Sequence, residues 1–131
     1  MISTRGRYAL RVMIDLAGHQ QEGFIPMKEV AARQGISLKY LEQILPVLSQ
    51  NNYVKAVHGK GGGYILAKDP SEITVGDILR LTEKELAPVA CLAEGAEGCE
   101  RENICPTLEF WKGYNQVVTE YLDSRTLADF L

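Results

Sequence analysis

The sequence predicts a mainly α-helical fold that carries one small β-hairpin. Apolar residues recur at helical spacing through most of the first 50 residues and again after residue 106. Between these segments, two short runs rich in β-branched and aromatic residues, 53–57 and 64–67, flank a glycine-rich turn, which is typical of a hairpin. With 131 residues, 46% of them hydrophobic, the chain has the length and composition of one domain with a buried core.

The first 34 residues are predicted to form two helices. Thr4 can cap the first, which extends to about Gly18. The segment 21–25 contains a glycine and is predicted to be a loop. Pro26 suits the first position of the second helix, which extends to Gln34.

A short turn then leads into a third helix. Gly35 suits the tight turn, and Ser37 caps the helix that follows. Pro46 lies inside this helix, where it removes one backbone hydrogen bond and is predicted to kink the helix or mark a frayed end. A helix, a short turn with glycine and a capped helix are typical of a helix-turn-helix, and a hairpin directly after it predicts a winged helix.

Two further helices are predicted after the hairpin. Thr74 and Asp77 form a capping pair for a short helix over 75–81. From about Pro106 a final helix of about four turns follows. One apolar stripe on it consists of Leu108, Trp111, Asn115, Val118 and Leu122, and a second face carries Tyr114, Val117 and Tyr121. Because so short a chain has little else to cover the second face, we expect a homodimer whose subunits meet along this helix.

The net charge of −3 hides an asymmetry. Residues 1–68 carry nine Lys and Arg against four Asp and Glu, whereas residues 69–131 carry five against thirteen. The two parts therefore have net charges of +5 and −8. This division predicts two roles on one chain. We expect residues 1–82 to be a winged-helix DNA-binding domain and residues 83–106, which contain all the cysteines, to be a sensor loop. Residues 107–131 are expected to form the dimerisation helix and the C-terminal tail.

The basic part contains candidate residues for binding double-stranded DNA. The start of a recognition helix contacts bases in the major groove, and the third helix begins with side chains of the types used there: Ser37, Lys39, Tyr40, Glu42 and Gln43. The glycine-rich turn lets His58 and Lys60 approach phosphates or a minor groove. Arg5 and Lys28 are candidates for contacts with phosphates. The turn does not match a nucleotide-binding loop, because it leads into a strand and lacks that motif's spacing.

The three cysteines of the chain, Cys91, Cys99 and Cys105, form the candidate metal site. All lie within fifteen residues of one another in a segment rich in Gly and Glu. Three thiolates nearly complete a four-ligand site for a soft metal. Structural zinc sites usually contain close cysteine pairs, and none is present, so the spacing favours an iron–sulfur cluster.

The chain resembles the Rrf-type winged-helix transcriptional regulators, and within them most closely the branch that senses iron–sulfur clusters. Related branches control cysteine metabolism or sense nitric oxide. The resemblance covers nearly the whole chain and depends on the segments Ser3–Leu10, Gln34–Gln43, Gly59–Tyr64, Ile73–Ile78 and Thr126–Asp129. It implies a homodimer with crossed C-terminal helices, two winged helices on a palindromic operator, and a cluster bound by the three cysteines. For this cluster, 2Fe-2S is the favoured type and 4Fe-4S is the alternative. It also implies base-reading positions for Ser37, Lys39, Glu42 and Gln43.

The chain departs from the branch that it resembles in three ways. Leu108 stands where that branch has a histidine as fourth ligand, and the first gap between cysteines is two residues longer. His58 stands where an arginine is common in the wing. The fourth ligand is therefore left open among Glu102, Glu109, Thr107, a residue of the partner chain, and exogenous water or thiol.

Other functions remain as alternatives or are excluded. The cysteines could instead form a thiol or zinc sensor, or the chain could bind DNA only together with a partner enzyme. An enzyme is not expected, because neither histidine, His19 or His58, is placed to pair with a nucleophile. The start of the chain does not match a signal peptide and no segment could span a membrane, so we expect a soluble cytoplasmic protein.

Overall fold

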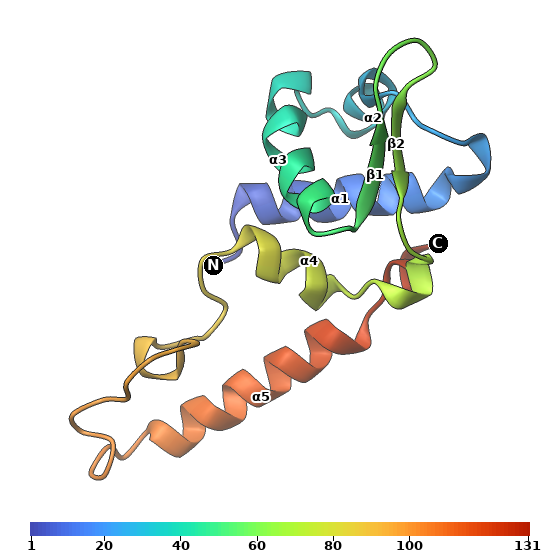
Figure 1. Cartoon of the computed structure of the whole chain (residues 1–131). Coiled ribbons are helices and arrows are strands. Elements are labelled where there is room, and N and C mark those ends of the chain that lie inside the picture. Colours follow the sequence, from blue (N-terminus) through green and yellow to red (C-terminus); the bar gives the residue numbers. More distant parts are fainter.

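The computed structural model describes all residues, 1–131, and has five α-helices and a two-stranded antiparallel hairpin (Figure 1). This confirms the predicted fold class. In Figure 1, α4 lies between α5 and the layer formed by α1, α2, α3 and the hairpin, and the chain from α4 to α5 extends away from that layer. The elements are α1 (Thr4–Gly18), α2 (Met27–Gln34), α3 (Leu38–Gln50), β1 (Val54–Val57), β2 (Gly63–Leu66), α4 (Val75–Thr82) and α5 (Leu108–Ser124).

Two helices begin at positions that differ slightly from the prediction. The cap of α1 is Ser3, whose Oγ accepts a hydrogen bond from the Gly6 N–H at 2.9 Å, so Thr4 is the first helical residue and not the cap. Pro26 caps α2 instead of occupying its first turn. The reason is a β-bridge between Ile25 and Tyr64, which keeps the chain extended up to Pro26.

Helix α3 is capped as predicted by Ser37, whose Oγ accepts a hydrogen bond from the Tyr40 N–H at 3.1 Å. The helix continues through Pro46 to Gln50, so Pro46 does not mark a frayed end. Pro46 is exposed. Water can therefore bond the backbone carbonyl that the missing N–H leaves without a partner.

The hydrophobic core joins the first four helices, the hairpin and the end of the chain. Seventeen buried residues form it, among them Met13 of α1, Leu41 of α3, Ile78 of α4 and Leu127 near the C-terminus. Leu127 is fully buried, and its N–H donates to the Ile73 carbonyl at 2.9 Å. The last residues of the chain therefore return to the core beside α1 and α4.

Gly63, at the start of β2, permits close contact between the hairpin and the segment that enters α2. A Cβ at this position would overlap the carbonyl group of Ile25. We expect Gly63→Ala to lower the free energy of unfolding by about 2–4 kcal/mol, because backbone must move to make room. Urea unfolding measures this change. Gly113→Ala is the control, since this exposed glycine of α5 does not have a left-handed backbone and no atom lies within 4 Å of a Cβ there. Equal losses in the two variants would contradict this explanation.

A buried carboxylate joins α1 to the end of α2. Asp15 of α1 is 6% exposed and accepts two hydrogen bonds from Arg33, at 2.7 and 3.0 Å, and one from Gln34 at 2.9 Å. Burial alone would raise the pKa of Asp15. The hydrogen bonds from Arg33 and Gln34, with the charges of Arg33 and His19, outweigh this effect and hold the pKa below its ordinary value.

This network predicts a stability difference that depends on pH. We expect Asp15→Asn to lower the free energy of unfolding by about 2 kcal/mol near neutral pH, a value reduced for the partial exposure of Arg33. Because the folded state lowers the pKa of Asp15, the carboxylate stabilises the fold above its unfolded pKa. That contribution disappears as the pH falls through the folded value. Urea unfolding of both proteins should show the difference shrinking in acid. If the difference in the free energy of unfolding between wild type and Asp15→Asn were the same at about pH 7 and about pH 3, the stabilising role of the ionised Asp15 carboxylate would be wrong.

Helix α5 packs against α4 with only part of its surface. The five residues of the predicted stripe, 108, 111, 115, 118 and 122, are half-buried, and Arg80 of α4 binds Asp123 through two hydrogen bonds of 2.8 Å. The second apolar face is exposed, with exposed fractions of 50% for Tyr114, 67% for Val117 and 58% for Tyr121.

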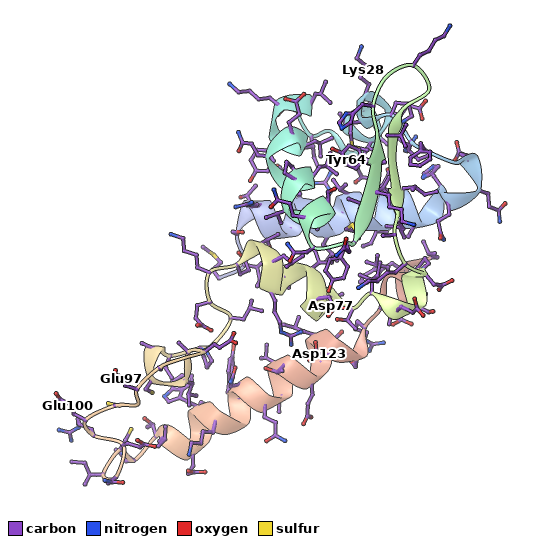
Figure 2. All side chains as sticks on the ribbon, in the orientation of Figure 1. Lys28, Tyr64, Asp77, Glu97, Glu100 and Asp123 are labelled. Atoms are coloured by element: carbon purple, nitrogen blue, oxygen red, sulfur yellow. The ribbon has the colours of Figure 1, made fainter.

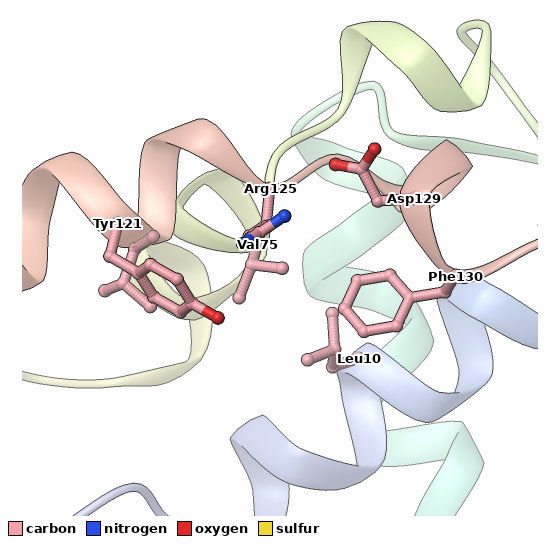
Figure 3. A pocket seen from close by; sticks show the side chains of 7 residues that line it. Leu10, Val75, Tyr121, Arg125, Asp129 and Phe130 are labelled. Carbon is pink, nitrogen blue, oxygen red and sulfur yellow. The ribbon is translucent and has the colours of Figure 1, made fainter.

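This exposed face continues into an open cavity of about 300 Å³ at the end of α5 (Figure 3). Tyr121 of α5, Val75 of α4, Leu10 of α1 and Phe130 near the C-terminus are among the residues that line it. None of the helices combines the length and the apolar character needed to cross a membrane.

Candidate DNA interface and cysteine segment

The start of α3 presents a polar surface. Gly35 adopts a left-handed conformation with φ of 64°, and the Ile36 N–H donates to the Ala31 carbonyl at 3.1 Å. This compact end of α2 allows α3 to begin directly after Ser37. The four side chains that could contact bases or phosphates there are all exposed: Ser37, Lys39, Glu42 and Gln43.

Tyr40 differs from the other candidates on α3 because it is half-buried. Its ring packs edge-to-face against Tyr8 of α1, with 5.3 Å between the ring centroids. The structure thus gives Tyr40 a packing contact between α1 and α3. A contact of Tyr40 with DNA stays a prediction.

The tip of the hairpin carries the two remaining candidate side chains of the wing. His58 and Lys60 are both exposed. Gly59 and Gly61 have φ of 93° and 79°, a conformation that favours glycine, and the Gly62 N–H donates to the Gly59 carbonyl at 3.0 Å. The turn is therefore narrow, and its backbone is free of side chains around Lys60.

Arg5 and Lys28 lie on other elements of the basic part. Arg5 is in the first turn of α1 and Lys28 in the first turn of α2, and both are exposed and outside the ion pairs of the structure. Figure 2 places Lys28 at the same end of the molecule as the hairpin tip, whereas Glu97 and Glu100 lie at the opposite end. The charge asymmetry of the sequence is thus also a separation in space, and the acidic end lies far from the hairpin.

The cysteine segment, residues 83–106, connects α4 to α5 with a single short 3₁₀ turn at Ala90–Leu92. Cys91 and Cys105 are half-buried, Cys99 is exposed, and all three are free thiols. No group of three His, Cys, Asp or Glu side chains in the chain is gathered closely enough to hold a metal ion. The structure therefore places the three thiols on one segment but does not bring them together.

Cys105, just before α5, is placed to form a thiolate. Hydrogen bonds from the side chain and backbone of Thr107 lower the pKa of the Cys105 thiol below its ordinary value, and the charge of Arg101 adds to the effect. Thiolate is the form that binds a soft metal, so the donor chemistry of the segment suits a cluster.

The residues considered for the fourth position have different surroundings. Glu102 is exposed, and Glu109 is 88% exposed with an ion pair to Lys112 at 3.4 Å. Thr107 contacts Cys105 through its hydroxyl at 3.5 Å. Leu108 is the first residue of α5 and part of the stripe that faces the rest of the chain.

One residue of the segment was missed by the sequence reasoning. Glu83, directly after α4, accepts two hydrogen bonds from Ser3 at the start of α1. Eighty positions separate the two residues, and an acidic side chain after a helix is usually solvated. No local sequence pattern could therefore have revealed this contact.

The helix-turn-helix with its hairpin wing defines a transcriptional regulator of the winged-helix class. The family model of Rrf2, described as an iron-dependent transcriptional regulator, matches residues 2–131, and the chain belongs to this family. The predicted resemblance is confirmed. The regulator IscR of Serratia proteamaculans is 39% identical over 130 residues, which are 99% of this chain and 78% of that protein. The members of this family are transcriptional regulators and not enzymes, and this chain is likewise a transcriptional regulator and not an enzyme.

Solved structures show the same relationship. IscR of T. potens superposes with a TM-score of 0.79 at 40% identity, covering 99% of this chain and 85% of that one. CymR of B. subtilis, named as its global cysteine regulator, superposes with a TM-score of 0.83 at 39% identity. The match covers 99% of this chain and 95% of the CymR chain. The similarity thus extends over the winged helix, the cysteine segment and α5.

Proposed function

We propose that this chain is a homodimeric DNA-binding regulator whose binding depends on an iron–sulfur cluster held by Cys91, Cys99 and Cys105. The observation that carries the proposal is the placement of all three cysteines on one segment of little regular structure between the winged helix and α5. The iron dependence named for the matching family supports it.

The cysteine segment can change its shape at low cost. Its backbone contains only one 3₁₀ turn, and residues 94–104 are all exposed. Three thiolates that bind one group must approach one another, which orders the chain between Cys91 and Cys105. A bound cluster supplies a redox-active centre that is sensitive to iron supply. The segment therefore has two states, one closed around a ligand and one open, as a switch requires.

The winged helix offers a surface for DNA. Exposed polar side chains at the start of α3 can contact base edges, with Gln43 suited to adenine, Glu42 to cytosine and Lys39 to guanine or phosphate. His58 and Lys60 at the tip of the hairpin suit a minor groove or its phosphates, and Arg5 and Lys28 suit phosphates. We assign DNA binding to residues 1–82, sensing to residues 83–106, and dimerisation to residues 107–131.

A second copy of the chain suits the exposed face of α5. Tyr114, Val117 and Tyr121 are each at least half exposed, and Phe110 is 65% exposed beside them. Contiguous aromatic and aliphatic surface of this kind marks an interface. Two copies related by a twofold axis would present two winged helices to a palindromic operator.

Metal analysis and DNA selection test the proposal separately. The chain is purified without oxygen, and its iron, zinc and acid-labile sulfide are measured together with its absorption spectrum. In parallel, the chain alone selects duplexes from a random pool, and the recovered sequences are tested for a palindrome.

We expect iron and sulfide with visible absorption bands, and a palindromic duplex. Zinc without sulfide would contradict the cluster and support a zinc or thiol sensor. Failure of the chain alone to select any duplex would contradict independent DNA binding and support a regulator that requires a partner enzyme.

A further inference from the structure

The first turn of α1 is held by a carboxylate from the cysteine segment. Glu83 Oε1 accepts a hydrogen bond from the Ser3 N–H at 2.6 Å, and Glu83 Oε2 accepts one from the Ser3 hydroxyl at 2.7 Å. Ser3 Oγ in turn accepts the Gly6 N–H at 2.9 Å as the cap of α1. A negative charge at this position also interacts favourably with the N-terminus of the helix.

Gly6 makes this contact sterically possible. It is buried, and a Cβ there would lie 2.7 Å from Glu83 Oε1 and 3.0 Å from the Thr82 hydroxyl. Glu83 itself is fixed by its own N–H, which donates to the Leu79 carbonyl at 2.9 Å. The end of α4 and the start of α1 are therefore in direct contact through the Glu83 carboxylate.

The next two turns of α1 contact the helix-turn-helix. Tyr8 packs against Tyr40 of α3 with 5.3 Å between ring centroids. The guanidinium of Arg11 lies 5.2 Å from the centroid of the Tyr8 ring and donates to the backbone carbonyl of Gln34, the last residue of α2. The start of α1 thus contacts both helices that flank the Gly35 turn.

We propose that Glu83 is a positioning residue for DNA binding. Its carboxylate fixes the first turn of α1, and α1 in turn fixes the recognition helix through Tyr8 and Arg11. Since Glu83 is also the first residue of the cysteine segment, a change in that segment reaches the winged helix through the contact with Ser3. This last step depends on the proposed function, whereas the positioning role requires only that the chain binds DNA.

The test compares Glu83→Gln with a matched control in the same segment. Glu85→Gln removes the same charge two residues further on, where the carboxylate accepts only the Leu86 and Ala87 N–H groups. Each full-length protein, free of metal, is titrated with a duplex that the wild-type chain selected from a random pool. Amide hydrogen exchange at Gly6 is measured in parallel.

We expect Glu83→Gln to bind the duplex about tenfold more weakly than wild type and to exchange the Gly6 amide faster, while Glu85→Gln changes neither. Ser3→Ala should weaken binding similarly, and the double variant should bind no worse than either single variant, because both changes remove one interaction. Glu83→Asp, which keeps the charge, should recover part of the affinity.

Two other outcomes are informative. Equal affinity of Glu83→Gln and Glu85→Gln for the duplex would overturn the positioning role. A wild-type chain that selects no duplex would overturn the proposed function instead, and faster exchange confined to Glu83→Gln would then still establish that Glu83 holds the start of α1.

Discussion

Replacing Cys91, Cys99 and Cys105 together with serine is expected to abolish iron binding by the chain while its fold is retained. Serine hydroxyls remain protonated at neutral pH and are poor ligands for a soft metal, so the variant lacks the donors of the proposed site. Cys99 is exposed and the other two are only half-buried, so the free energy of unfolding should change by less than about 1 kcal/mol. Iron and sulfide analysis after anaerobic purification, with a thermal unfolding curve, measures both effects.

The acidic residues of the same segment provide the control for the cysteine variant. Glu97→Gln and Glu100→Gln change exposed side chains between the cysteines without removing a thiol. These variants should retain the iron content of the wild type. If the triple serine variant bound as much iron as these two glutamine variants, the assignment of the three cysteines as iron ligands would be wrong.

The cysteine variant also tests the link to DNA. If the three cysteines affect the winged helix only when they hold a ligand, the triple serine variant should bind a selected duplex with the affinity of the metal-free wild-type chain. Adding iron and sulfide should then change the affinity of the wild type and leave that of the variant unchanged. This comparison separates an effect of the cluster from an effect of iron on DNA binding in general.

Local patterns were sufficient to predict most of the fold. Ser37 and the pair Thr74 and Asp77 cap α3 and α4 as predicted, because a cap depends on residues only three positions apart. The start of α2 was displaced by a long-range contact, whereas α1 differs only in which of two adjacent hydroxyl residues caps it, Ser3 instead of Thr4. Glu83 holds Ser3 from 80 positions away, and the bridge from Tyr64 keeps Ile25 extended. Such contacts have no local signal.

The candidate site was predictable to different degrees. Exposure of Lys39, Glu42 and Gln43 follows from the helical period once Leu41 and Ile44 are assigned to the core. The packing of Tyr40 against Tyr8 depends on how α1 crosses α3, which the period does not determine. The three cysteines were recognisable as a group by spacing, yet no pattern in a segment without helix or strand specifies their arrangement in space.

The second large effect is expected from Val117→Asp on the exposed face of α5. Val117 is 67% exposed in the single chain, so the change should leave the fold of one copy intact. In a dimer that covers this face, the new carboxylate would be buried without a partner, which costs several kcal/mol. We therefore expect a monomer by light scattering and a specific DNA affinity reduced by at least about a hundredfold, because only one half-site is then held.

Gln116→Asp is the matched control for the dimer, since it places the same charge one residue away on the exposed polar side of α5. There the carboxylate remains in water, and we expect an unchanged mass and unchanged DNA affinity. A Val117→Asp variant that stays dimeric would show that the copies meet elsewhere, and a monomeric wild-type chain would contradict the proposed dimer. If the Val117→Asp variant were a monomer and still bound DNA with full affinity, one winged helix would be sufficient for specific binding. The dimer would then not be needed to hold both half-sites of the palindrome.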